Sequence, residues 1–147
     1  ADMCTSLDDT MSIAALTQSL LRYLYRMRDK PGNWPLYSRF LIDQNRWRAM
    51  RYGYDQGLID FATAEVVPVK ELLADIVERV HADAVELGCA REVEHALSIP
   101  KRGTSAHMQV KIYNDAIRAG TAPDEAMRAV VDWLIEGTVS GLKLSTD

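Results

Sequence analysis

The sequence of 147 residues lacks the features that mark several large classes of protein. Its two cysteines, Cys4 and Cys89, are too few for a disulfide framework and are not spaced as a zinc motif, and free thiols fit a reducing cytosol. No stretch approaches the roughly 20 consecutive apolar residues that span a bilayer, and the N-terminus lacks the basic-then-apolar layout of a signal peptide. We therefore expect a cytoplasmic protein without a membrane partner.

Basic residues are also in short supply. Lys and Arg number 17 against 21 Asp and Glu, which gives a formal net charge of −4. Proteins that coat nucleic acid depend on many Lys and Arg contacts to phosphate, so this balance argues against nucleic acid as a partner. Hydrophobic residues make up 48% of the chain and charged residues 26%, an ordinary composition for one folded domain or part of a larger one.

Helical spacing of apolar residues organises the first half of the chain. The first predicted helix carries its apolar stripe between Ile13 and Met27, and the Pro- and Gly-rich segment 29–35 ends it. A second helix runs from about Leu36 to Gly53, where a glycine can adopt the left-handed conformation that closes a helix. The N-cap candidates of the first helix are Asp8, Asp9 and Thr10.

Segment 58–67 is short and partly β-branched, which predicts a tight loop or a small hairpin. A third helix opens at Pro68 and ends near Gly88, and a short helix follows to about Leu97. Segment 98–103 contains Pro100 and is expected to be a loop.

Two more helices complete the predicted fold. Thr104 or Ser105 caps the first, which Gly120 closes, and Thr121 with Pro123 opens the second. The residues of this last helix that are expected to point inward are Met127, Val130, Val131 and Leu134. The polar tail 142–147 is expected to fray. The fold class is therefore mainly α, with five or six helices and at most a small β-hairpin.

Polar residues outside the arginine cluster described next give weak signals. His81, Asp83 and Glu86 share one helix, and Glu92 stands three residues before His95, as in carboxylate-bridged metal sites. Such a site needs a second pair of this kind, which the sequence does not supply, so we interpret these residues as surface polar groups and predict no metal ligands.

The segment "DQNRWRAMRYGYDQGLID", residues 43–60, concentrates three arginines among aromatic residues. It could be a solvated helix face, a nucleic-acid patch, or a device that holds phosphate and carboxylate oxygens. In the first case Asp43 pairs with Arg39 and Arg46, and Asp55 with Arg51. In the last case, guanidinium groups with a fixed fork of donors bind oxygens bidentately. The overall acidity makes the nucleic-acid patch the weakest of the three.

Part of this segment, "NRWRAMRYGYD" at residues 45–55, resembles the Asn-basic-aromatic-x-Ala-x-Arg-aromatic-Gly-Leu-Asp motif of carboxylate–amine ligases known as type 2 glutamate–cysteine ligases. Two further stretches, "LGCAREVE" at 87–94 and "RGTSAHMQVKIY" at 102–113, are similar to that family in the same order. The likeness covers only the family's C-terminal portion. It implies the helical C-terminal part of a larger α+β ligase with a glutamine synthetase-like sheet, which would lie upstream of Ala1.

The resemblance implies ATP-dependent amide formation, in which ATP phosphorylates a carboxylate such as the γ-carboxylate of glutamate and an amine displaces phosphate from the acyl phosphate. Implied cofactors are ATP and Mg, with metal ligands upstream of this chain. Arg46 and Arg51 would be catalytic, and Gly53 and Asp55 would give structural support. Residues implied in substrate or phosphate binding are Asn45, Arg48, Thr104, Ser105 and Gln109.

Three positions depart from the family pattern. Gln44 and His107 each stand where the family usually has an acidic residue, and Tyr54 stands where it usually has Leu. They leave the identity of the carboxylate and of the amine open. Implied partners are small-molecule substrates and either the missing N-terminal part or a partner chain, and a homo-oligomer is compatible with the sequence. The 147-residue chain alone is expected to be inactive. The alternative is a non-catalytic helical module that binds another protein.

Overall fold

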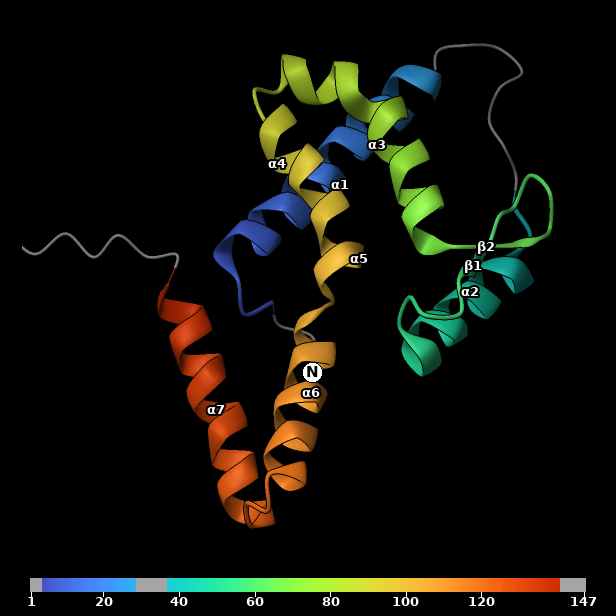
Figure 1. The fold of residues 1–147 in the computed structure, drawn as a ribbon. Helices are drawn as coiled ribbons and strands as arrows, with labels where there is room; N and C mark the ends of the chain where they lie inside the picture. The colour runs from blue at the N-terminus through green and yellow to red at the C-terminus, as the bar shows by residue number, and fades with distance from the viewer. Residues whose placement is uncertain (1–3, 29–36, 141–147) are drawn as a thin grey trace, which may run out of the picture.

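The computed structural model describes residues 4–28 and 37–140, and their fold is mainly helical (Figure 1). The five helices of 14 or more residues in this part of the chain are α1 (Leu7–Arg28), α2 (Arg39–Tyr52), α3 (Val69–Glu86), α6 (Ser105–Arg118) and α7 (Pro123–Val139). The short elements are β1 (Leu58–Ile59), β2 (Val66–Val67), α4 (Ala90–His95), the 3₁₀ turn η1 (Ala96–Ser98) and α5 (Ile99–Arg102). The expected fold class is confirmed.

Of the two forms expected for segment 58–67, a tight loop or a small hairpin, the structure has the hairpin, because β1 and β2 pair antiparallel with Leu58 opposite Val67. The expected break at 29–35 and the expected frayed tail at 142–147 lie outside the described residues. Among the helices described, none has the length and apolar character needed to cross a membrane.

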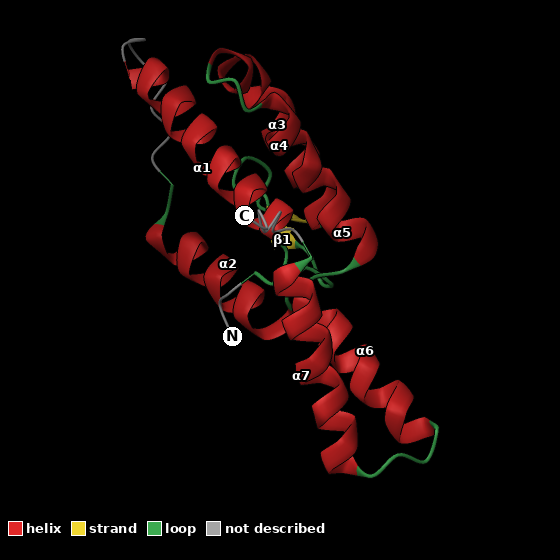
Figure 2. Ribbon diagram, turned by 90° about the vertical axis from the view of Figure 1, so that its left-hand side faces the viewer, coloured by secondary structure: helices red, strands yellow, loops and turns green. Residues whose placement is uncertain are grey.

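The helices group into three units that share few contacts with one another (Figures 1 and 2). In the first unit, α1 packs against α3 and α4 around a small core. That core consists of Ala15, Val77, Val80, Ala84 and Val93. The second unit is α2 with the β1–β2 hairpin, and the third is the α6–α7 helical hairpin, which projects away from the first.

Asp83 corrects the interpretation of this region as surface polar residues. Its side chain is 1% exposed, between α1 and α3, and Arg26 donates to both of its oxygens at 2.7 and 2.6 Å. Arg22 adds a third bond at 3.2 Å. The hydrogen bonds from Arg26 hold the pKa of the Asp83 carboxyl below its ordinary value, although burial alone would raise it. These ion pairs of Asp83 with Arg22 and Arg26, which we call the Asp83 lock, join α1 to α3.

The structure differs from the predictions at the start of the first helix and at the predicted loop over 98–103. The first helix begins at Leu7, one residue after Ser6, whose hydroxyl accepts a bond of 3.4 Å from the Asp9 N–H. Asp8 and Asp9 therefore lie in the first turn, where a carboxylate is favourable beside the positive end of the helix dipole. The predicted loop over 98–103 is wrong, because residues 99–102 form α5 with its proline in the first turn, where the missing N–H costs nothing.

In the last helix only part of the expected inward face is buried. Val130 is 6% exposed and Leu134 is half-buried, whereas Met127 and Val131 are 54% and 47% exposed. Ala126, next to Met127 in the sequence, is buried instead, at 0% exposure. A single neighbouring helix covers only one side of α7, so the rest of its apolar face stays open to solvent.

Candidate functional site

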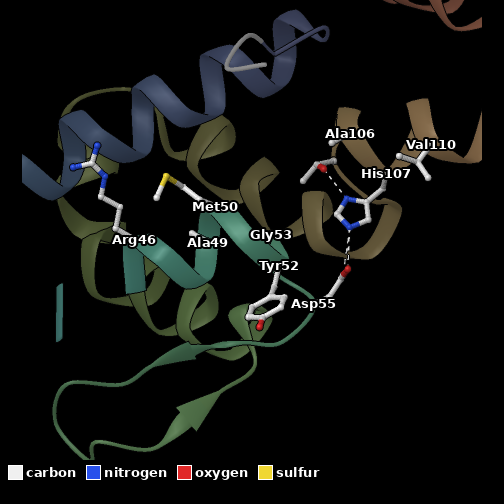
Figure 3. Close-up of a pocket in the computed structure, with 10 residues that line it drawn as sticks. Arg46, Ala49, Met50, Tyr52, Gly53, Asp55, Ala106, His107 and Val110 are labelled. Carbon is white, nitrogen blue, oxygen red and sulfur yellow. Dashed lines mark hydrogen bonds and ion pairs between the residues drawn. The ribbon is translucent and has the colours of Figure 1, made fainter. Parts of the chain in front are cut away.

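An open groove of about 810 Å³ lies where the C-terminal half of α2 meets the start of α6. The residues that line it are Arg46, Ala49, Met50, Tyr52, Gly53, Asp55, Thr104, Ala106, His107 and Val110. Figure 3 shows Arg46 at one end and His107 with Asp55 at the other, on either side of an apolar stretch. Of the predicted site residues, the groove brings together Arg46, Gly53, Asp55 and Thr104.

His107 is the centre of the polar contacts in this groove. Its Nδ1 lies 2.6 Å from Thr104 Oγ1, and its Nε2 lies 3.3 and 3.4 Å from the two carboxylate oxygens of Asp55. A carboxylate only accepts, so in the neutral imidazole Nε2–H donates to Asp55 and the Thr104 hydroxyl donates to Nδ1. The ring of Tyr54 lies against the imidazole at a centroid distance of 4.7 Å. The imidazole thereby joins two segments 52 positions apart.

Two glycines with positive φ lie next to His107. Gly53 ends α2 with φ of 60°, and a Cβ there would lie 3.7 Å from His107 Cε1. Gly103 precedes α6 with φ of 92°, and its Cβ would lie 3.3 Å from His107 Cβ, closer than an ordinary contact. The chain turns at Gly53 in a conformation that side chains rarely adopt, and the supporting role expected of this glycine stays a prediction.

The pairing expected between Asp55 and Arg51 is not formed. Because the chain leaves the helix at Gly53, Asp55 is no longer one helical turn from Arg51, and it pairs with His107 instead. Arg39 lies 3.9 Å from Asp43, a long contact between exposed groups.

Arg46 and Arg51 make no hydrogen bond or ion pair with any residue that the structure describes. Arg46 lines the groove and Arg51 does not. Five positions turn an α-helix by about 500°, which leaves the two side chains about 140° apart around α2. The two expected catalytic arginines therefore do not converge on one site within this chain. Among the described residues, Arg46 is the one arginine that lines the groove.

Asn45 and Arg48 hold the segment that follows α2. The Asn45 side chain donates to the carbonyl of Ile59 at 2.8 Å and accepts from its N–H at 2.7 Å. Arg48 donates to the carbonyls of Gly57 and Gln56 at 3.2 and 2.6 Å. Both side chains thus fasten β1 along α2, and their implied contact with substrate stays a prediction.

The two other predicted residues on α6 lie beside the groove. Gln109 donates to Ser105 Oγ at 3.0 Å, and neither lines the groove. Thr104 is the N-cap by its extended backbone, but its hydroxyl contacts His107 and caps no N–H. The positive end of the α6 dipole therefore has no side-chain cap, and the negative charge near it is the Asp55 carboxylate, which contacts His107 of the first turn.

A second polar cluster joins α1 to α4 and α5. His95 Nε2 lies 2.9 Å from Asp9 Oδ1, and Arg102 also pairs with Asp9. The adjoining depression, of about 490 Å³, is lined mainly by acidic residues and Arg91. The described residues contain no group of three or more His, Cys, Asp or Glu side chains arranged to hold a metal ion. We interpret this cluster as a structural contact.

His107 has a larger part in the groove than its sequence context indicates, because the sequence marks it only as a departure from a family pattern. Its role depends on Asp55, which is distant in the sequence, and no spacing rule connects them. The available signal was local: a histidine three residues after an N-cap threonine, in a segment that begins with a glycine.

The family model described as glutamate–cysteine ligase family 2 matches residues 1–132. A relative from Rhodospirillum rubrum, provisionally named a glutamate–cysteine ligase 2, is 50% identical over 142 residues, which cover 97% of this chain and 36% of the relative. A relative from Jannaschia sp. with the same provisional name is 44% identical over 135 residues, or 92% of this chain and 35% of the relative. The chain thus spans about a third of the length of these curated relatives. No solved structure matches it.

Proposed function

We propose that this chain forms the helical C-terminal part of an ATP-dependent carboxylate–amine ligase. The chain belongs to glutamate–cysteine ligase family 2, and this membership supports the proposal. In the proposed reaction the γ-phosphoryl group of ATP is transferred to a substrate carboxylate and ADP leaves. An amine then attacks the acyl carbon of the acyl phosphate, expels inorganic phosphate and forms the amide. The amine loses a proton in this step.

The observation that carries the proposal is the guanidinium of Arg46, which lines the groove from α2, at the end away from His107, and is unpaired among the described residues. Phosphoryl transfer is catalysed mainly by groups that position the reactants and place positive charge against oxygens that gain negative charge. An arginine suits this task because its planar fork binds two oxygens at once. Within the described part of the chain no carboxylate competes for Arg46, so its donors are available to a ligand.

Asp55 divides the groove by charge. Its carboxylate lies at the His107 end and repels an anion there, whereas Arg46 attracts one at the other end. We therefore assign the phosphate or carboxylate oxygens to the Arg46 end. His107, held by Thr104 and Asp55, keeps α6 beside α2 and so maintains the shape of the groove.

The cofactors of the proposal are ATP and Mg, whose ligands we expect in the part of the ligase outside this chain. Glutamate is the first carboxylate to test, because the relatives carry its name. Cysteine is the first amine to test for the same reason. The described residues do not select between cysteine and another amine.

The experiment uses a family-length chimera, defined as the R. rubrum relative with its matched segment replaced by this chain. We expect ADP release with Mg-ATP only when both the carboxylate and the amine are present. Arg46→Ala should lower kcat/KM about 10- to 100-fold, the usual cost of removing a charge-assisted hydrogen bond. The matched control is Arg39→Ala, on the same helix and with a side chain 95% exposed, which should keep full activity.

Full activity in both Arg46→Ala and Arg51→Ala would refute the catalytic role of this helix. The second candidate, a non-catalytic interaction module, is favoured by the exposed apolar side chains of α7. It predicts a folded chain that binds another protein and a chimera that shows no coupling between ADP release and the two substrates.

A further inference from the structure

The α6–α7 hairpin carries an apolar surface that no described residue covers. Four residues of α7 recur at every fourth position and so form one stripe along the helix: Met127, Val131, Ile135 and Val139. Their exposed fractions are 54%, 47%, 59% and 47%. We call these four residues the α7 stripe. Such a run of exposed large apolar side chains marks an interaction surface in a folded protein.

The hairpin does not need this stripe for its own packing. The buried residues of α7 are Ala126 and Val130, at 0% and 6% exposure, and the helix that α7 packs against is α6. The stripe lies one position further round the helix, and α6 does not reach it. The hairpin also projects away from the α1–α3–α4 unit, so no helix of that unit lies over it (Figures 1 and 2). The apolar face of α7 is therefore wider than one neighbouring helix can cover.

The comparison with relatives indicates what could cover it. The match to the R. rubrum relative takes in 97% of this chain, so it includes the hairpin, yet it accounts for only 36% of that relative. Proteins of this family therefore carry about two thirds of their length outside the segment that corresponds to this chain. In a protein of that full length, this remaining two thirds is part of the same molecule as the α6–α7 hairpin.

The charges on α7 argue against a second copy of this chain as the occupant. The helix carries four acidic residues, Asp124, Glu125, Asp132 and Glu136, against one basic residue, Arg128. Two copies paired along the α7 stripe would bring two acidic helices side by side, which like-charge repulsion opposes. A partner surface with an apolar centre and a basic rim fits this helix better.

We propose that the α7 stripe docks onto the part of the ligase that lies outside this chain, through a surface with an apolar centre and basic residues at its edge. The inference rests on the proposed function in one respect, that this chain works as part of a longer ligase. It does not depend on which carboxylate or amine is used. The docking would hold the hairpin, and with it the start of α6 and the groove, in a fixed position against the rest of the ligase.

The test measures the reaction rate of a single thiol with a maleimide. Val131→Cys is made in a background in which Cys4 and Cys89 are replaced by serine and alanine, both in the 147-residue chain and in the family-length chimera. The thiol should react at least tenfold more slowly in the chimera than in the chain alone. The matched control is Ala129→Cys, which is exposed and about 160° away around the same helix, and its rate should be similar in both proteins.

Equal rates for the thiol at position 131 in the two proteins would overturn the proposal. A rate in the chain alone that falls as chain concentration rises would also overturn it, because a second copy would then be the occupant. If the chimera does not fold, a cysteine at the aligned position of the intact R. rubrum relative gives the same comparison without a splice. The measurement needs neither nucleotide nor turnover, so a protected thiol in an inactive protein would uphold the docking and refute only the proposed function.

Discussion

Replacing Asp83 by asparagine tests the lock between α1 and α3. The substitution keeps the shape of the side chain but removes its charge, and three hydrogen bonds from Arg26 and Arg22 lose their ionic character. Breaking a buried ion pair costs about 3–5 kcal/mol. The two arginines are 49% and 38% exposed and can return to water, so we expect the lower end, a loss of about 3 kcal/mol.

The assay is urea unfolding of the 147-residue chain followed by circular dichroism, with the change in free energy of unfolding as the readout. The matched control is Asp75→Asn on the same helix, which removes a long contact of 3.9 Å to Arg79 between two exposed side chains. That control should change stability by less than about 1 kcal/mol. A loss at position 83 no larger than at position 75 would refute the assignment of this carboxylate as a lock.

The same variant carries a pH dependence of known sign. The folded state lowers the pKa of the Asp83 carboxyl, so its contribution is fully present above the unfolded value of about 4. It is lost as pH falls through the lower folded value. The stability difference between the native chain and Asp83→Asn should therefore stay constant between about pH 5 and 7 and shrink in more acid solution. A difference that grows as the solution becomes more acid would contradict this.

Three other predictions concern the groove and its frame. Asn45→Ala removes both hydrogen bonds to Ile59, and should lower the free energy of unfolding by about 1–2 kcal/mol and speed hydrogen exchange at the Ile59 N–H. Unchanged exchange would show that these two bonds do not hold β1 against α2. Gly103→Ala places a Cβ 3.3 Å from His107 Cβ at a φ of 92°, and should destabilise the chain by more than about 1 kcal/mol in a thermal melt. The matched control is Gly137→Ala, which lies within a helix and whose Cβ would make only a 3.8 Å contact. This control should be neutral or stabilising in the same melt. If both glycine variants melt alike, the ring is not held as described. Arg46→Ala in the chimera should lose activity while Arg39→Ala does not.

The sequence predicted the helices well because apolar spacing is a local property. The stripe of α3, the glycine ends of α2 and α6, and the hairpin after α2 all depend on residues within one or two turns of each other. Two local predictions failed, the N-cap of the first helix and the loop over 98–103, and the other failures involve partners that are distant in the sequence. The lock at Asp83 had a visible signal, because an acidic residue lies on the apolar stripe of α3 three positions after Val80, and Arg22 and Arg26 continue the buried line of α1 after Ser19. That signal becomes interpretable only when the two helices are placed side by side.

The candidate site divides in the same way. The separation of Arg46 from Arg51 follows from their spacing of five residues and the geometry of an α-helix, so the sequence alone is enough to derive it. The contact of Asp55 with His107 has no such local origin, because it depends on how α6 lies against the end of α2. The hydrogen bonds of Asn45 and Arg48 likewise depend on how segment 56–59 lies along α2, which their spacing in the sequence does not indicate.

The central claim, ligation through an acyl phosphate, is tested most directly by following oxygen from the carboxylate. The chimera is given Mg-ATP, an amine and glutamate labelled with ¹⁸O in its γ-carboxylate, and the phosphate released is analysed by mass spectrometry. Attack of the carboxylate on the γ-phosphoryl group leaves one carboxylate oxygen on phosphorus, so we predict one ¹⁸O in each phosphate formed with the amide. Amide formation with unlabelled phosphate, or with release of AMP and pyrophosphate, would contradict the account.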